Sequence, residues 1–262
     1  MNLVMIGPAA QSSSIAQSNN LLINTLHELG HSVSIIRSES KEYLGGEAYA
    51  FAKGAKHWNT DATKELLKNA DLIFYVLGNN IQYHEGVLHL RNDYPGLMIL
   101  HDICLTKLFL EFTQQQSSKE NAVKELKDYV SYWYGAAAAK KCSAVNDLSD
   151  VEKMATQYFP MTEWGAMNAL GVITHFSEGL QRIAKVCSGP IVALSDVKDS
   201  TMILDSQFYA DNVINIAHSV LRLAPFLSTA RQSGAHLAKW GMTPDSSAIK
   251  YVVEPMRILA GK

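Results

Sequence analysis

Short apolar runs alternate along this chain with longer stretches of helical periodicity, and no other feature restricts its fold so strongly. The clearest run extends from Asp71 to Leu77, and Gly78-Asn79-Asn80 ends it. Strand-like runs that alternate with helical patterns are typical of a parallel sheet covered by helices. Five further runs predict strands in the same way: Leu3–Ile6, Ser32–Ile36, Leu97–Leu100, Gly171–Thr174 and Pro190–Leu194. The sequence therefore predicts an α/β fold with a Rossmann-like parallel sheet.

The segments between these runs carry apolar residues at helical spacing. The serines at 12–14 can cap the first helix, and Gly30 stands where a helix end needs left-handed backbone. Residues 38–56 are expected to form a loop. Helices are predicted over residues 15–29, 61–69, 83–93, 177–186, 210–223 and 224–239, and a final turn or helix over 244–259.

Length and pattern favour one main domain with helical additions. A chain of 262 residues with 47% hydrophobic residues can bury a large core. Residues 1–205 are predicted to form the Rossmann-like domain, with a helical insertion at about 105–170 that breaks near 114–118 and 146–149. Residues 206–262 are predicted to form an all-helical tail, packed on the same domain.

Charge and cysteine content restrict the partners and the compartment. The formal net charge is −2 and 18% of residues are charged, so the sequence carries no electrostatic signature of nucleic-acid binding. The three cysteines form no CxxC pair, which favours a reducing cytoplasm. Residues 1–7 lack a basic signal region, and no apolar stretch approaches the length of a membrane span. We expect a cytoplasmic protein without a transmembrane segment, while peripheral membrane contact stays open.

Candidate binding residues follow four of the predicted strands. They are Gly7-Pro8, Gly78-Asn79-Asn80 with His84, His101-Asp102, and His175 with Ser177. In an open parallel sheet, ligands bind beyond the carboxyl ends of the strands. These residues are therefore expected to converge on one edge of the sheet.

His101 is the first candidate for chemistry, because a neutral imidazole can accept a proton from a hydroxyl group or hydrogen-bond to a sugar. Asp102 could orient that ring if the backbone geometry permits. Asn79 and Asn80 offer carboxamides that donate and accept hydrogen bonds, and the turn that contains them is expected to be flexible. Each of these residues also has a purely structural interpretation, as a strand-end cap or a turn residue.

The loop after Gly7-Pro8 could place backbone N–H groups at a helix N-terminus, where a phosphate or a sugar hydroxyl would be favoured. An ordinary β–α turn with serine caps is the alternative. No metal-ligand spacing and no DxD motif is present, so neither a metal nor a cofactor is predicted. The aromatic stretch Tyr132-Trp133-Tyr134 could stack on a sugar or a lipid carrier, although core packing is favoured at helical spacing.

Four stretches together resemble the N-terminal domain of family 4 (group 1) glycosyltransferases of the GT-B type, especially bacterial ones. They are residues 71–80 with His84, residues 94–102, the region around Tyr132 to Gly135, and residues 169–177. Residues 94–102 resemble the family element in which Pro-Gly, a strand and Leu-His-Asp follow one another. Residues 169–177 resemble the family's strand end, with Phe176 inserted between His175 and Ser177.

This resemblance implies a sugar-transferring protein of polysaccharide biosynthesis that binds a sugar or glycan acceptor and uses a nucleotide-sugar donor. It implies that His101 lies near the donor sugar. The donor-binding domain of this family would stand between about residues 194 and 207, where this chain continues almost directly into its terminal helices. A donor-domain subunit or a homo-oligomer is therefore expected to complete the enzyme. The alternatives are a non-catalytic carbohydrate-binding or regulatory protein, and a truncated or engineered form of a longer enzyme.

Overall fold

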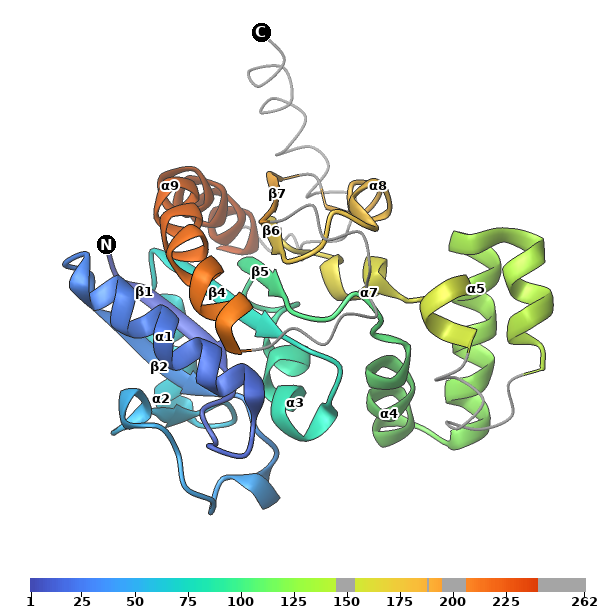
Figure 1. Cartoon of the computed structure of the whole chain (residues 1–262), viewed down its shortest axis with the longest axis horizontal. Helices are drawn as coiled ribbons and strands as arrows, with labels where there is room; N and C mark the ends of the chain where they lie inside the picture. The colour runs from blue at the N-terminus through green and yellow to red at the C-terminus, as the bar shows by residue number, and fades with distance from the viewer. Residues whose placement is uncertain (145–153, 188, 195–205, 240–262) are drawn as a thin grey trace, which may run out of the picture.

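The computed structural model describes residues 1–144, 154–187, 189–194 and 206–239, with side chains of the last segment described from 212 to 232 (Figure 1). Its centre is one seven-stranded sheet in the order β3-β2-β1-β4-β5-β6-β7, and all neighbouring strands are parallel. The strands are β1 (Leu3–Gly7), β2 (Val33–Arg37), β3 (Lys56–His57), β4 (Leu72–Leu77), β5 (Leu97–Leu100), β6 (Gly171–Thr174) and β7 (Ile191–Ala193). The predicted α/β fold with a Rossmann-like parallel sheet is confirmed.

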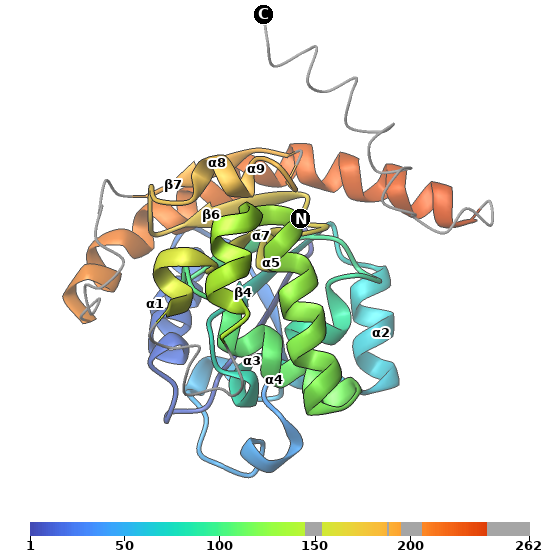
Figure 2. The same cartoon turned by 90° about the vertical axis from the view of Figure 1, so that its right-hand side faces the viewer.

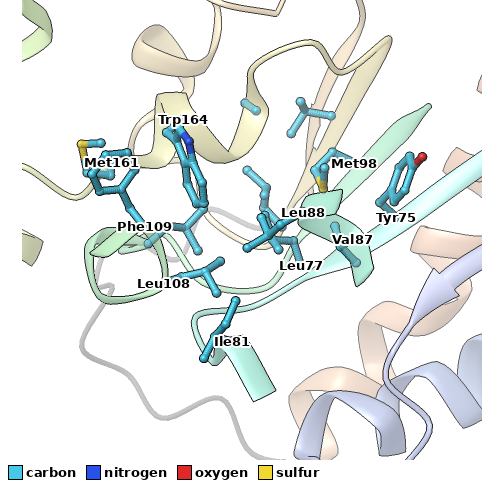
Figure 3. Close-up of a cluster of buried hydrophobic side chains, with 14 of the residues drawn as sticks. Tyr75, Leu77, Ile81, Val87, Leu88, Met98, Leu108, Phe109, Met161 and Trp164 are labelled. Atoms are coloured by element: carbon cyan, nitrogen blue, oxygen red, sulfur yellow. The ribbon is translucent and has the colours of Figure 1, made fainter. Parts of the chain in front are cut away.

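The central strand β4 has both faces buried, which explains its unbroken apolar sequence. Ile73, Tyr75 and Leu77 belong to the core on one face of the sheet. Leu72, Phe74 and Val76 belong to the core on the other. Figure 3 shows the first of these cores, where Tyr75 and Leu77 lie among side chains from the neighbouring strand and from helices. The period-two alternation of a strand thus builds two separate cores from one hexapeptide.

Helices α1 (Ser14–Glu28) and α9 (Ser206–Lys239) cover one face of the sheet. The N-terminal end of α1 is capped by Ser13, whose hydroxyl accepts the Ala16 N–H at 3.3 Å. At the other end Gly30 has a φ of 84°, and the N–H groups of Gly30 and His31 bond to carbonyls of the last turn. Both predicted signals for this helix are confirmed. α9 runs beside α1 as one long helix (Figure 2).

The opposite face is covered by helices that follow β3, β4, β5 and β6. They are α2 (Asp61–Lys68), α3 (Ile81–Leu90), α4 (Thr106–Gln116), α5 (Lys119–Cys142), α7 (Thr162–Ala166) and α8 (Leu180–Ile183). In Figure 1, α4 and α5 lie on the far side of the sheet from α1. The predicted break near 114–118 is confirmed, because α4 ends at Gln116 and α5 begins at Lys119. The break predicted at 146–149 lies outside the described residues.

Three details differ from the sequence prediction. Residues 38–56 contain the 3₁₀ turns η1 (Lys41–Tyr43) and η2 (Ala50–Ala52), and they end in the start of β3, a strand too short for any periodicity to reveal. The helix predicted over 177–186 narrows to α8, because Gly179 has a φ of 85° and separates Ser177 from it. The final turn or helix predicted over 244–259 lies outside the described residues.

The two helices predicted at 210–223 and 224–239 are one helix, α9, which contains Pro225. A proline inside a helix removes one backbone hydrogen bond and costs about 3 kcal/mol. Leu223, Ala224 and Leu227 are buried against the sheet on both sides of this proline. This packing keeps the helix continuous where its sequence alone predicts an interruption.

Residues 212–232 of α9 form the one stretch in the described chain that is long and apolar enough to cross a membrane. Half of that stretch is buried inside the protein, and Val213, Ile216 and Val220 belong to the sheet's core. The core helix of a globular domain meets the same test of length and composition, so this helix by itself gives weak support for membrane insertion.

Candidate functional site

The strand order places a topological switch point between β1 and β4. From β1 the chain first builds the sheet outward through β2 and β3, and it then returns to add β4 on the other side. Leu77 pairs with Leu100, and Leu100 with Thr174, so β4, β5 and β6 end side by side. Gly7 ends β1 at the same edge, opposite Arg37 of β2. The ten candidate residues lie at or after the carboxyl ends of these strands, so the predicted convergence on one edge is confirmed.

His84 lies in α3 and closes the turn after β4. Its ring donates through Nδ1 to the Val76 carbonyl at 3.1 Å and accepts the Gly78 N–H through Nε2 at 3.1 Å. Burial lowers the pKa of His84 to about 3, so the ring is neutral at neutral pH. Both ring nitrogens are therefore used by the backbone of β4 and its turn, which gives His84 a structural role.

Gly78 is required by close packing rather than by flexibility, which corrects the sequence interpretation. A Cβ atom at this position would lie 2.9 Å from Asp102 Oδ2 and 2.9 Å from His84 Nε2, and closer still to the side chain of Ile15. Its φ lies outside the left-handed region. The turn is tightly enclosed by α1, α3 and the end of β5.

Asp102 ties the end of β5 to this turn, because its Oδ2 accepts the Asn79 N–H at 2.9 Å. Burial raises the pKa of Asp102, while the hydrogen bond from Asn79 lowers it in part. Asn80 caps α3 through its Oδ1, which accepts the Gln82 N–H at 3.0 Å. Asn79 and Asn80 are both exposed. Asp102 therefore positions the turn that presents these two carboxamides at the edge.

His101 and His175 form a pair at the ends of β5 and β6, with ring centroids 4.6 Å apart and an angle of 53° between the ring planes. Both are buried. Burial, followed by the neighbouring His175 and His84, holds the pKa of His101 well below its usual range. Burial lowers the pKa of His175 to about 4. The structure thus brings together two histidines, 74 positions apart in the sequence, as a neutral pair.

This electrostatic setting changes the role expected for His101. A lowered pKa makes a histidine a weaker proton acceptor, which favours a hydrogen-bonding role for His101 over a general-base role. A neutral imidazole still carries one donor and one acceptor nitrogen, which suits hydrogen bonding to hydroxyl groups. Ser177, half-buried two residues beyond His175, lies at the same edge in a turn where its carbonyl accepts the Leu180 N–H at 3.4 Å.

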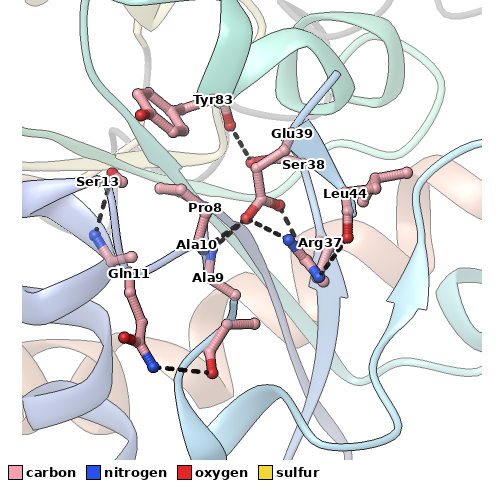
Figure 4. Close-up of polar contacts among 12 residues, drawn as sticks. Pro8, Ala9, Ala10, Gln11, Ser13, Arg37, Ser38, Glu39, Leu44 and Tyr83 are labelled. Atoms are coloured by element: carbon pink, nitrogen blue, oxygen red, sulfur yellow. Dashed lines mark hydrogen bonds and ion pairs between the residues drawn. The ribbon is translucent and has the colours of Figure 1, made fainter. Parts of the chain in front are cut away.

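The loop after β1 is already occupied by a side chain of the protein. Glu39, which follows β2, is fully buried, and its Oε1 accepts the N–H groups of Ala9 and Ala10, each at 2.7 Å (Figure 4). Arg37 pairs with the same carboxylate at 3.2 Å. Behind the loop, Asn19 donates to the Pro8 carbonyl at 2.9 Å. Two of the backbone donors that the sequence offered to a phosphate or sugar are therefore satisfied internally.

A second buried carboxylate, Glu163 in α7, lies beyond the ends of β5 and β6. It accepts the hydroxyl of Tyr134 and pairs with Arg182 of α8 at 3.7 Å. Tyr134 precedes Gly135, whose φ of 77° interrupts α5. Tyr134 is thus held by a polar contact, whereas Tyr132 is 83% exposed and Trp133 packs against the core.

No pattern in the sequence indicates Glu39 or Glu163 as a site residue. Glu39 lies about 30 positions from the amides it binds, and no spacing rule connects a residue after β2 with the loop after β1. The only available signal was a single acidic residue just beyond an apolar strand. Among the described residues, no group of three or more histidine, cysteine or acidic side chains is arranged to hold a metal ion.

Comparison with protein-family models, with curated proteins and with solved structures gives no match. The edge formed by the carboxyl ends of β1, β4, β5 and β6, called the strand-end edge below, is therefore the main structural guide to the function of this chain.

Proposed function

We propose that the chain binds a sugar or glycan at the strand-end edge, as the acceptor-side half of a glycosyltransferase that uses a nucleotide-sugar donor. The main support for this proposal is that the neutral pair of His101 and His175 belongs to the same edge as the exposed Asn79 and Asn80. The sequence resemblance to family 4 glycosyltransferases gives further support, because three of its four stretches end at this edge.

Neutral imidazoles and carboxamides suit hydroxyl-rich ligands, because each such group can both donate and accept a hydrogen bond. A hydroxyl group needs both functions to replace the water that it loses on binding. Burial keeps the rings of His101 and His175 neutral at neutral pH, so neither ring attracts an anionic ligand through a formal charge. The edge therefore matches the chemistry of an uncharged sugar.

Transfer of the sugar would require a second unit that binds the nucleotide of the donor. The described residues form one parallel sheet with its covering helices, and the proposed activity therefore depends on a donor-binding subunit or a second copy of this chain. The three cysteines are unpaired, which supports the proposed cytoplasmic location.

Calorimetric titration with a panel of glycans and nucleotide sugars tests this proposal. We expect a glycan to bind, and His101→Ala to weaken binding by about tenfold or more through the loss of a buried hydrogen-bonding group. His27→Ala, which changes an exposed histidine of α1, is the matched control and leaves affinity unchanged. Binding that is equal in wild type and His101→Ala would contradict the proposal.

A non-catalytic carbohydrate-binding role is the second candidate. It is favoured by the low pKa of His101, because recognition needs no proton transfer whereas general-base catalysis does. The two roles differ in one result: glycan binding without sugar transfer in any mixture with candidate donor-binding proteins supports the non-catalytic role.

A further inference from the structure

The Glu39 carboxylate sits where a parallel α/β fold commonly offers a place for an anion. In such folds the loop between β1 and α1 presents backbone N–H groups, and the N-terminus of α1 adds a partial positive charge. Here α1 has 15 residues, and the N–H groups of Ala9 and Ala10 both point at Glu39 Oε1. The contacts of 2.7 Å have the length of charge-assisted hydrogen bonds.

A basic side chain completes this arrangement. Arg37 approaches the same carboxylate through Nη2 at 3.2 Å and Nε at 3.4 Å, and its Nη1 donates to the Leu44 carbonyl at 3.3 Å. Two backbone donors and a guanidinium are the groups that would surround a bound phosphate. In this protein they surround a carboxylate of its own chain (Figure 4).

Several contacts fix Glu39 in this position. Its carbonyl accepts hydrogen bonds from Trp58 Nε1 at 3.2 Å and from His57 Nε2 at 3.1 Å. The preceding residue, Ser38, donates its hydroxyl to the Tyr83 carbonyl at 2.6 Å. The segment after Glu39 is joined to the loop after β1, because the Tyr49 N–H donates to the Ala9 carbonyl at 2.9 Å. Glu39 is thus held from both sides of its own backbone.

We propose that Glu39 is an internal anion that excludes phosphate groups from the loop after β1 and so determines which ligands this edge accepts. The ligand then meets the edge beyond β4, β5 and β6 with its hydroxyl groups, and the phosphates of a nucleotide-sugar donor are held by another polypeptide. The statement about the ligand rests on the proposed sugar-binding function, whereas the exclusion of phosphate rests on the geometry of Glu39 alone.

Titration with inorganic pyrophosphate at constant ionic strength tests the exclusion. Wild type is expected to give no specific binding. Glu39→Ala frees two N–H groups and Arg37, and it is expected to bind pyrophosphate at least about tenfold more tightly. Glu42→Ala removes the same charge from an exposed position nearby and is the matched control, with affinity as in wild type. Equal affinity of wild type and Glu39→Ala would overturn the proposal.

A measurement on the wild-type chain covers the case in which Glu39→Ala does not fold. The backbone amide resonances of Ala9 and Ala10 are followed by NMR while pyrophosphate is added. They are expected to stay in place, and a saturable shift of both would overturn the proposal. This outcome is independent of sugar binding. Equal glycan affinity of wild type and His101→Ala, with pyrophosphate still excluded, would refute the proposed function and leave the role of Glu39 intact.

Discussion

Two parts of the same sheet edge differ in how their polar groups are satisfied. Around β1 and β2, a buried carboxylate, two amides and a guanidinium neutralise one another within the chain. Around β5 and β6, two buried histidines avoid charge altogether, because burial lowers the pKa of both. The first part satisfies its polar groups by ion pairing, whereas the second keeps its buried histidines neutral. One part of the edge is thus ion-paired within the chain, and the proposed sugar binding is assigned to the neutral part.

The largest effect is expected from Glu39→Ala on stability. This change leaves Arg37 and two amides without their anion, and breaking a buried ion pair costs about 3–5 kcal/mol. Chemical denaturation measures the loss. Glu39→Gln keeps an oxygen that can accept from Ala9 and Ala10 and is expected to lose less. A loss below about 1 kcal/mol, the value typical of exposed ion pairs, would contradict the structural role given to this half of the edge.

Gly78→Ala tests the turn that joins the two halves. The added Cβ would press on Asp102, His84 and Ile15, and we expect a loss of about 3 kcal/mol, at the upper end for overpacking. Gly45→Ala is the matched control, because nothing lies within 4 Å of a Cβ there and its φ is not in the left-handed region. Thermal or chemical unfolding compares the two variants, and similar losses in both would refute the account of Gly78.

The neutral histidines predict that the protein loses stability in mild acid. The pKa of His175 is about 4 in the folded protein against about 6.5 when unfolded, so its stabilising contribution is complete above pH 6.5 and declines as the pH falls. Between pH 7 and pH 5 this one group accounts for a loss of about 2 kcal/mol.

Unfolding free energies of wild type and His175→Gln at several pH values measure this contribution. The variant is expected to lose stability less steeply between pH 7 and pH 5, because glutamine does not titrate. His27→Gln, at an exposed position, is the control. An equally steep decline in wild type and His175→Gln would show that His175 is not held neutral by burial.

The smallest effect is expected from Asn80→Ala, which removes the cap of α3 and costs about 1 kcal/mol. Asn80→Asp keeps an oxygen for the Gln82 N–H and is expected to retain most of the stability. Asn24→Ala, at an exposed position within α1, is the control without a cap. An unchanged unfolding midpoint in Asn80→Ala would show that this cap does not stabilise the protein, and ligand binding would then be the remaining role for Asn80.

The sequence predicts the central strands well because β1, β4, β5 and β6 are buried on both faces. Leu72 to Leu77 alternates between two cores, so every position is apolar and the run is unmistakable. The strand-end candidates follow from the same logic, since a parallel sheet brings all carboxyl ends to one edge. The short strand β3 and the continuity of α9 through Pro225 depend on tertiary packing, which has no local signature.

The candidate site was predictable in its location and only partly in its chemistry. His101 and Asp102 are adjacent in the sequence, yet Asp102 bonds to the turn after β4 and His101 pairs with His175. Glu39 could not have been found, because the amides that it binds lie about 30 residues away. Partners that come together only through the fold leave no spacing for sequence analysis to detect.

The most direct test of the comparison is an NMR titration of the wild-type chain with neutral oligosaccharides, and separately with pyrophosphate. A bound oligosaccharide is expected to shift the amides of Asn79, Asn80 and the residues after β6, while pyrophosphate leaves Ala9 and Ala10 unchanged. The opposite pattern, with pyrophosphate shifting Ala9 and Ala10 and no sugar shifting the edge beyond β4 to β6, would contradict it.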